Sequence, residues 1–285
     1  MEKNLNFEVF HSTWAMERRH PQLPEWSLAE QCEMVASAGF QGFNIDPETP
    51  FIPDVKSCRT ALANAGLGCS ICAFPASLED VRASLNYCAE VDATALVINA
   101  RIFPFSPEGA VEFVESSLEL GRNANIPVQF ETHRFTLTND LLFTHQLLAL
   151  CPDLDLVADL SHYVVGREIP LPVDSFHQNL ISKILSRCVS IQGRVANREQ
   201  IQVPIHFPRH QPWVRQFYQW WEQGMRSFIE RAEEGATFNF TCELGPPDYA
   251  ITDSKGFELS DRWNESNIFR EQVERTWNKL VNERV

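Results

Sequence analysis

The stretch "IPVQFETHRFTLTNDLLFTHQLLALCPDLDLVADLSH" (residues 126–162) reads as a strand, a helix and a second strand. Its first and last parts are short apolar runs, and a longer helix-like run of 139–152 lies between them. Parallel strands need such a crossover, because a tight hairpin joins only antiparallel neighbours. The stretch therefore predicts one βαβ unit of a parallel sheet.

The same alternation extends to both ends of the chain, with about eight strand-helix pairs in 285 residues. The apolar runs look nearly continuous, which is typical of strands that helices cover on both faces. Ser27 with Glu30, and Ser77 with Asp80, have the spacing of helix-capping boxes. We expect one (β/α)8 TIM barrel domain over residues 1–285, with a doubly wound open sheet as the alternative.

Composition excludes several classes of protein. Hydrophobic residues make up 44% of the chain and charged residues 22%, as in ordinary folded proteins. The formal charge of −14 would repel nucleic acid, so we expect no nucleic-acid partner. We expect no membrane association, because no apolar run approaches a membrane span in length and the first residues do not resemble a signal peptide. These features predict a cytoplasmic protein.

The eight cysteines lie mostly inside apolar segments, as reduced core cysteines do. Only Cys69 and Cys72, in "CSIC", are closely spaced. Positions three apart on a strand point to opposite faces, so we do not expect a redox or zinc pair there.

Polar side chains follow four consecutive predicted strands, at the point where each strand ends. They are Glu131, Asp159, Gln192 and Glu243. In a parallel barrel these positions converge on one mouth. Three carboxylates held close together repel one another unless a cation neutralises them, and oxygen ligands suit Mg²⁺ or Mn²⁺. The alternative is that each acid pairs with an arginine at the rim.

Four motifs carry a resemblance to a known family. "FETHR", "ADLSH", "QGRV" with the later "QVP", and "CELGPPDY" resemble the xylose isomerase-like sugar phosphate isomerase and epimerase family, in the right order over nearly the whole chain. The resemblance implies that Glu131, Asp159, Gln192 and Glu243 are metal ligands, and that Glu131 and Glu243 also exchange protons with the substrate. It places His162 beside the substrate, and Arg194 matches an arginine of the seventh-strand motif.

One position departs from the family pattern. The family usually has a histidine where this chain has Gln192. An amide oxygen is a harder and weaker ligand than imidazole, so the expected ion is Mn²⁺ or Mg²⁺ rather than Zn²⁺. Loss of the metal remains an alternative.

The expected substrate is a small sugar or related hydroxy-carbonyl compound. Glutamate side chains of the protein remove a proton from a substrate carbon and return it, while the cation stabilises the ene-diolate. Return of the proton to the opposite face gives an epimer, and return to the neighbouring carbon gives aldose-ketose isomerisation. The sequence does not choose between them. A metal-dependent lyase or dehydratase and a non-catalytic sugar-binding barrel are the alternatives, and a multi-zinc endonuclease is disfavoured by the negative charge.

The sequence also predicts roles for residues outside the four expected ligands. We expect His11, His133 and Arg194 to contact substrate, and Arg134 to form a salt bridge behind the site. Arg194 and Arg198 leave open an acidic substrate. The loop 202–212 is expected to lie over the mouth, and the aromatic run 217–228 to serve as core or as the interface of a homo-oligomer.

Overall fold

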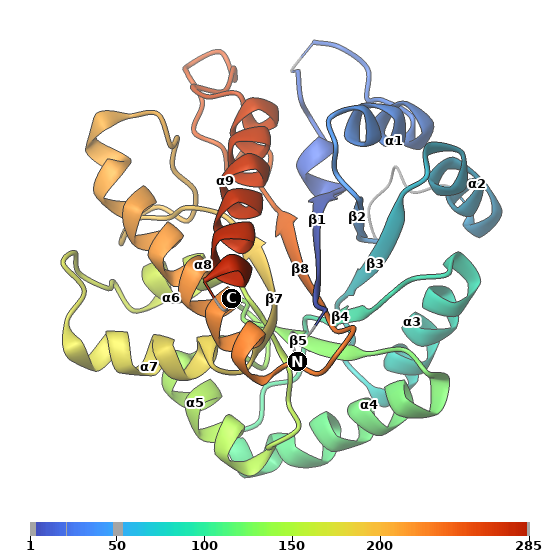
Figure 1. Cartoon of the computed structure of the whole chain (residues 1–285), viewed down its shortest axis with the longest axis vertical. Coiled ribbons are helices and arrows are strands. Elements are labelled where there is room, and N and C mark those ends of the chain that lie inside the picture. The colour runs from blue at the N-terminus through green and yellow to red at the C-terminus, as the bar shows by residue number, and fades with distance from the viewer. Residues whose placement is uncertain (1–3, 21, 48–53, 284–285) are drawn as a thin grey trace.

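The computed structural model describes residues 4–20, 22–47 and 54–283. Its strands pair in sequence order, all parallel, and β8 pairs with β1, so the sheet closes into a barrel. Figure 1 shows the strands at the centre with helices around them. The strands are β1 (Asn6–Ser12), β2 (Gly42–Ile45), β3 (Gly68–Ala73), β4 (Leu96–Ile98), β5 (Val128–Glu131), β6 (Leu156–Ala158), β7 (Cys188–Gly193) and β8 (Thr237–Cys242). The predicted TIM barrel is confirmed.

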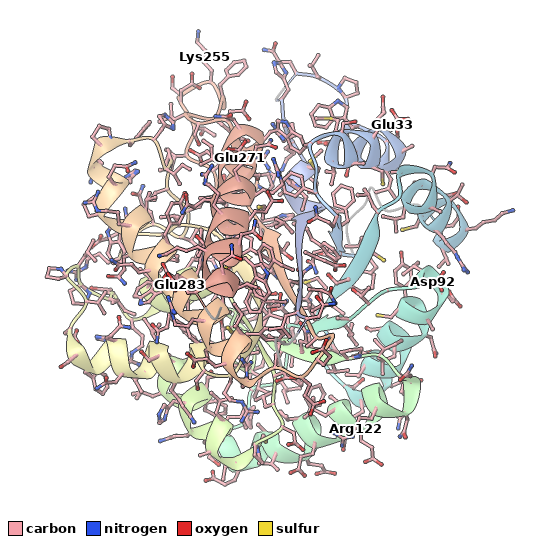
Figure 2. All side chains as sticks on the ribbon, viewed as in Figure 1. Glu33, Asp92, Arg122, Lys255, Glu271 and Glu283 are labelled. Carbon is pink, nitrogen blue, oxygen red and sulfur yellow. The ribbon has the colours of Figure 1, made fainter. Side chains whose placement is uncertain are left out.

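Helices follow the strands and form the outer layer. They are α1 (Leu28–Ser37), α2 (Val55–Ala65), α3 (Leu78–Val91), α4 (Val111–Ala124), α5 (Leu141–Leu150), α6 (Leu160–Gly166), α7 (Ser175–Leu185), α8 (Gln211–Arg231) and α9 (Arg262–Asn282), with short 3-10 turns η1 (Trp14–Met16), η2 (Pro107–Ala110) and η3 (Pro208–His210). The predicted capping box of Ser27 and Glu30 begins α1. At the start of α3 the Ser77 hydroxyl accepts from the Asp80 amide, as in a capping box, and the Asp80 carboxylate accepts from the Ala76 amide. Charged side chains such as Glu33, Arg122 and Glu271 lie on the outside (Figure 2). Among the described helices, none is both long and apolar enough to span a bilayer.

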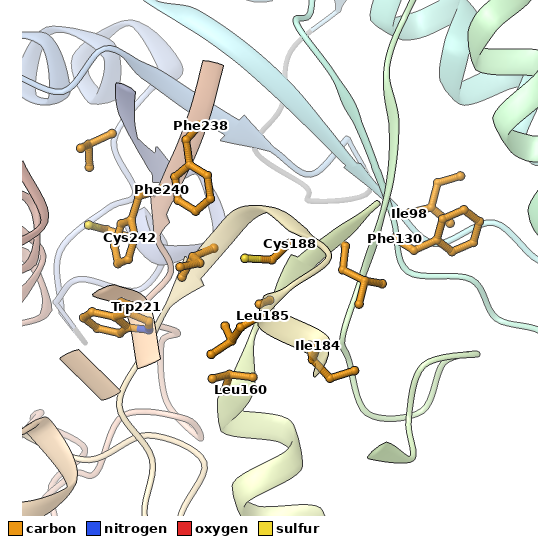
Figure 3. Close-up of a cluster of buried hydrophobic side chains, with 14 of the residues drawn as sticks. Ile98, Phe130, Leu160, Ile184, Leu185, Cys188, Trp221, Phe238, Phe240 and Cys242 are labelled. Atoms are coloured by element: carbon orange, nitrogen blue, oxygen red, sulfur yellow. The ribbon is translucent and has the colours of Figure 1, made fainter. Parts of the chain in front are cut away.

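The main hydrophobic core lies between the barrel and its helices. Trp221 of α8 packs edge-on against Phe240 of β8, with ring centroids 5.0 Å apart, and against Phe269 of α9 at 5.1 Å. Figure 3 shows part of this layer, including Phe130, Phe240 and Trp221. The aromatic run 217–228 therefore forms core, which is one of its two predicted roles.

Part of the barrel interior is polar. The expectation of nearly continuous apolar strands holds for β4 and β6 but is wrong for β8. On β8, Phe238 and Phe240 are buried in the outer core, whereas Thr237, Asn239 and Thr241 line a cavity inside the barrel. TIM barrels usually fill this space with bulky branched residues. Strands that alternate between an apolar outer face and a polar inner face leave room for chemistry within the barrel.

Close packing inside the barrel makes Gly42 hard to replace. A β-carbon there would lie 2.5 Å from the carbonyl oxygen of Gly68 and 2.6 Å from the ring of Phe10. Since the backbone of β3 cannot yield easily, we expect Gly42→Ala to lower the free energy of unfolding by about 1–3 kcal/mol. Gly166→Ala is the control, because a β-carbon there would meet no atom within 4 Å outside its chain neighbours and its own helix backbone. Urea denaturation measures both, and equal stabilities of the two variants would contradict this packing.

Candidate active site

Three carboxylates meet where neighbouring strands end. Glu131 is the last residue of β5, Asp159 follows β6 and caps α6, and Glu243 follows β8. One oxygen of each lies within 4.8 Å of the others. Their exposed fractions are 1%, 0% and 8%, so solvent does little to screen their mutual repulsion.

A buried guanidinium lies between two of these acids. Arg194 comes just after β7, and its Nη2 is 2.7 Å from Asp159 Oδ2 and 2.6 Å from Glu243 Oε2. Burial alone would lower the pKa of Arg194, but the two carboxylates outweigh it and raise the pKa above its usual value. The substrate contact expected of Arg194 stays a prediction, and the structure shows this side chain as the resident cation of the acid cluster.

Glu131 is held by two side-chain amides. Gln192 Nε2 donates to Glu131 Oε2 at 2.6 Å, and Asn99 Nδ2 donates to the same oxygen at 2.8 Å. Glu131 Oε1 and Gln192 Oε1 are buried and accept no hydrogen bond from any described residue. Two buried acceptors without a donor are costly unless a cation or a donor group binds there.

The three carboxyl groups differ in their electrostatics. Burial, together with the charges of Glu243 and Asp159, raises the pKa of Glu131 well above its usual range. Burial raises the pKa of Glu243 to about 7, although Arg194 opposes this shift. Burial also acts to raise the pKa of Asp159, but Arg194 and His162 outweigh it and hold that pKa below its usual range. Near neutral pH, Asp159 therefore carries charge most readily.

Two histidines lie beside the acids. His162 Nε2 is 3.3 Å from Asp159 Oδ2, and the rings of His162 and His133 are 4.0 Å apart between centroids. Burial lowers the pKa of both rings, to about 3 for His133, and so favours their neutral forms. One nitrogen of each lies close enough to an oxygen of Glu131 to form a second possible ligand group.

His11 lies away from this cluster, contrary to its predicted substrate contact. Its ring packs against Phe40, Phe43 and Trp263, with centroids 5.3, 6.2 and 5.4 Å away, and only 1% of the residue is exposed. Neighbouring strand residues face opposite sides. Glu8 lines the interior cavity, so His11, three positions later, faces the helices.

Burial of His11 should make stability depend on pH. Burial lowers the pKa of this ring to about 3, whereas an unfolded histidine titrates near 6.5. The unfolded chain thus binds a proton that the folded chain does not, and stability falls as pH falls from about 6.5 towards 3. We expect His11→Leu to reduce this slope by about 1 kcal/mol per pH unit. Urea denaturation at pH 6, 5 and 4 measures it, and parallel profiles would contradict the shift.

Aromatic side chains pack on the buried guanidinium of the cluster. The Arg194 guanidinium lies 5.6 Å from the ring centroid of Trp14 and 4.9 Å from that of Tyr249. Arg134 lies 4.9 Å from the centroid of Tyr249. The salt bridge predicted for Arg134 is therefore wrong for the described residues, because the side chain packs on Tyr249 instead.

The predicted mouth loop is fixed at one end to the segment that follows β8. Gln202 exchanges two hydrogen bonds with the backbone of Gly245, at 3.0 and 2.7 Å, in the segment after β8. The loop is shorter than 202–212 suggested, since η3 begins at Pro208 and α8 at Gln211. His206 and His210 bond to Glu265 and to the Pro204 carbonyl, away from the acids.

The donor set fits a divalent cation. The cluster combines three carboxylates with one guanidinium, so its net charge is −2 when all four groups are ionised. Oxygen-rich sets of this kind suit Mg²⁺ or Mn²⁺. The two unpartnered oxygens, Glu131 Oε1 and Gln192 Oε1, are acceptors that an ion would satisfy.

No family model and no curated protein sequence matches the chain. Solved structures do. A xylose isomerase-like TIM barrel protein from Mycobacterium smegmatis, in complex with magnesium, superposes with a TM-score of 0.61 over 95% of this chain and 97% of its own, at 15% identity. The chain has the xylose isomerase-like TIM-barrel fold.

Two further structures share the xylose isomerase-like fold. A D-allulose 3-epimerase from Methylomonas sp., in complex with D-allulose, covers 97% of this chain and 99% of its own, with 13% identity and a TM-score of 0.60. A sugar phosphate isomerase/epimerase from Parabacteroides distasonis covers 99% and 96%, with 13% identity and a TM-score of 0.59. At these identities the likeness establishes the fold.

Sequence reasoning missed part of the site. Tyr249 lies inside the quoted run "CELGPPDY", yet nothing in that run indicates that its ring packs between two guanidinium groups. Asn99 was not missed: the sequence places it at the end of the fourth strand as a possible hydrogen-bonding partner of substrate, and the structure shows it donating to Glu131 Oε2.

Proposed function

We propose that this protein is a divalent-metal-dependent isomerase or epimerase of a small sugar or related hydroxy-carbonyl compound. The observation that carries the proposal is the buried cluster of Glu131, Asp159 and Glu243, which sets three carboxyl groups against one guanidinium, beside two buried oxygens that have no partner among the described residues. Such a cluster is costly to bury unless a ligand completes it. Sugar epimerases among the proteins of similar fold support the same class of substrate.

Glu131, Asp159, Glu243 and the amide oxygen of Gln192 would hold the ion. A bound Mn²⁺ or Mg²⁺ would stabilise the negative charge that develops on substrate oxygen when a carbon-bound proton leaves. Hydrogen bonds within the protein already orient the two glutamates of this site. Asn99 and Gln192 fix the orientation of Glu131, and Arg194 fixes that of Glu243.

Glu131 and Glu243 would exchange the proton with substrate carbon. A general base works best when its pKa lies near the working pH, and burial brings the pKa of Glu243 to about 7. His162 and His133, both neutral and adjacent, would accept or donate hydrogen bonds to substrate hydroxyls. Trp14 and Tyr249 would exclude water above the reacting carbons.

Deuterium exchange tests the proposal across a panel of candidate sugars. Ketoses, aldoses and their phosphates are incubated with the protein and Mn²⁺ in D₂O and followed by NMR. We expect at least one compound to gain deuterium beside its carbonyl and to give an epimer or isomer. A dehydrated or cleaved product would favour the lyase alternative. No exchange with any compound, in protein shown to contain the ion, would contradict the proposal.

The position of Arg194 supports a second candidate function, that of a non-catalytic sugar-binding barrel without a metal. Its guanidinium already bridges Asp159 and Glu243 at 2.7 and 2.6 Å, so part of the acid cluster is neutralised by the chain itself. This candidate predicts that Mn²⁺ and Mg²⁺ leave the melting temperature unchanged while a sugar raises it. Under the metal-dependent proposal, Mn²⁺ alone raises the melting temperature.

A further inference from the structure

The cavity inside the barrel opens at the end opposite to the mouth. Its volume is about 290 Å³, far more than the roughly 15 Å³ that one water molecule requires. It is lined by Glu8, Asn44, Ser70, Thr94, Ala95, Val97, Pro127, Gln129, Val157, Ser190, Gln192, Thr237, Asn239 and Thr241. These residues lie on or next to all strands of the barrel, so the cavity runs inside it.

Most of the residues that line the cavity have polar side chains, which indicates a hydrated cavity. Hydroxyl and amide side chains from β2, β3, β7 and β8 face it, and only a few bond to one another. Asn44 Nδ2 donates to Ser70 Oγ at 2.9 Å, and Thr241 Oγ1 donates to Asn239 Oδ1 at 3.0 Å. Apolar cavities stay dry, whereas a roomy cavity with several polar partners holds water.

Solvent reaches this cavity from the N-terminal ends of the strands. Thr94, Pro127 and Thr237, which lie at or just before strand starts, are exposed. Gln129 and Asn239 lie one step inside and remain partly exposed.

The inner end of the cavity reaches the back of the acid cluster. Gln192 lines the cavity, is 1% exposed, and donates to Glu131. Its Oε1 has no partner among the described residues. A single side-chain amide thus lies between the cavity and the acid cluster, whose guanidinium packs against Trp14 and Tyr249.

We propose that this cavity is a water-filled conduit that connects solvent at the N-terminal face of the barrel to the back of the acid cluster. It provides a route for water to a site whose guanidinium packs against aromatic rings. Its existence follows from the cavity and its lining, so it does not depend on the reaction that the site performs.

Cysteine accessibility tests the conduit in the whole protein. Thr241→Cys and Ser190→Cys place small thiols in the cavity wall, at residues that are 3% and 4% exposed. Ser117→Cys is the control, because Ser117 is fully buried in α4 and lies outside the cavity. Each variant is treated with methyl methanethiosulfonate, a small neutral reagent, and modification is located by peptide mass spectrometry. We expect the cavity thiols to react at least tenfold faster than the control thiol in α4 and the native buried cysteines.

A plug at the entrance tests the direction of access. Thr237→Phe, added to Thr241→Cys, places a bulky ring at the exposed end of the cavity and should slow modification at least tenfold. Thr60→Phe is the matched control on the exposed face of α2 and should leave the rate unchanged. Melting curves confirm that each variant is folded, and Ser190→Cys takes the place of Thr241→Cys if the latter is not. Cavity thiols as inert as the control thiol in α4, or a rate that the plug does not change, would overturn the conduit.

Discussion

Arg194→Leu is expected to lower the free energy of unfolding of the metal-free protein by about 3–5 kcal/mol, because it leaves buried carboxylates without their cation. Asp159 and Glu243 both bond to Arg194 Nη2, and the arginine itself is only 1% exposed. Urea denaturation at pH 8, in the presence of a chelator, measures the loss. Mn²⁺ added without the chelator should restore part of the stability, since the bound ion then neutralises the acids in place of the guanidinium.

Arg198→Leu is the matched control. Arg198 lies four residues further along, is 44% exposed at its side chain, and pairs with the exposed acids Glu168 and Glu199. Exposed ion pairs contribute about 0–1 kcal/mol. An Arg194 variant that is no less stable than the Arg198 variant would show that the acids do not depend on this guanidinium.

Glu131→Gln and Glu243→Gln are each expected to reduce kcat/KM by about 10²–10⁴-fold on whichever sugar exchanges deuterium, because neither amide can take a proton from carbon. The change keeps the size of each side chain, so the barrel should remain folded. If the two residues act on opposite faces of the substrate, each variant should also lose exchange from one epimer more than from the other. NMR in D₂O measures both effects.

Glu199→Gln is the control for these variants, because Glu199 is exposed and pairs only with Arg198 among the described residues. Near wild-type exchange in Glu131→Gln or Glu243→Gln, with normal melting curves, would remove that glutamate from the proposed proton transfer.

The barrel and the meeting of its acids could be predicted from the sequence. In a parallel barrel all strands end at the same mouth, so a polar residue directly after an apolar run is expected to lie at that mouth. Glu131, Asp159 and Glu243 follow this rule, and the structure brings them together. Their roles as ligands and proton carriers remain proposals.

The direction of individual side chains is harder to predict, because one position along a strand reverses it. His11 is expected at the mouth but faces the helices. The run "TFNFTCE" does contain the missing signal: its strict alternation of polar and apolar residues indicates a polar interior. The contacts of Arg134 and Tyr249 depend on the conformation of loops, which the hydrophobic periodicity of the sequence does not predict.

The central claim is that Glu131, Asp159, Gln192 and Glu243 hold one divalent ion. Titration of chelator-treated protein with Mn²⁺, followed by electron paramagnetic resonance of the free ion, tests it most directly. The account predicts one ion bound per chain in the wild type and at least tenfold weaker binding in Asp159→Asn. No bound ion in the wild type, or equal binding in Asp159→Asn, would contradict it.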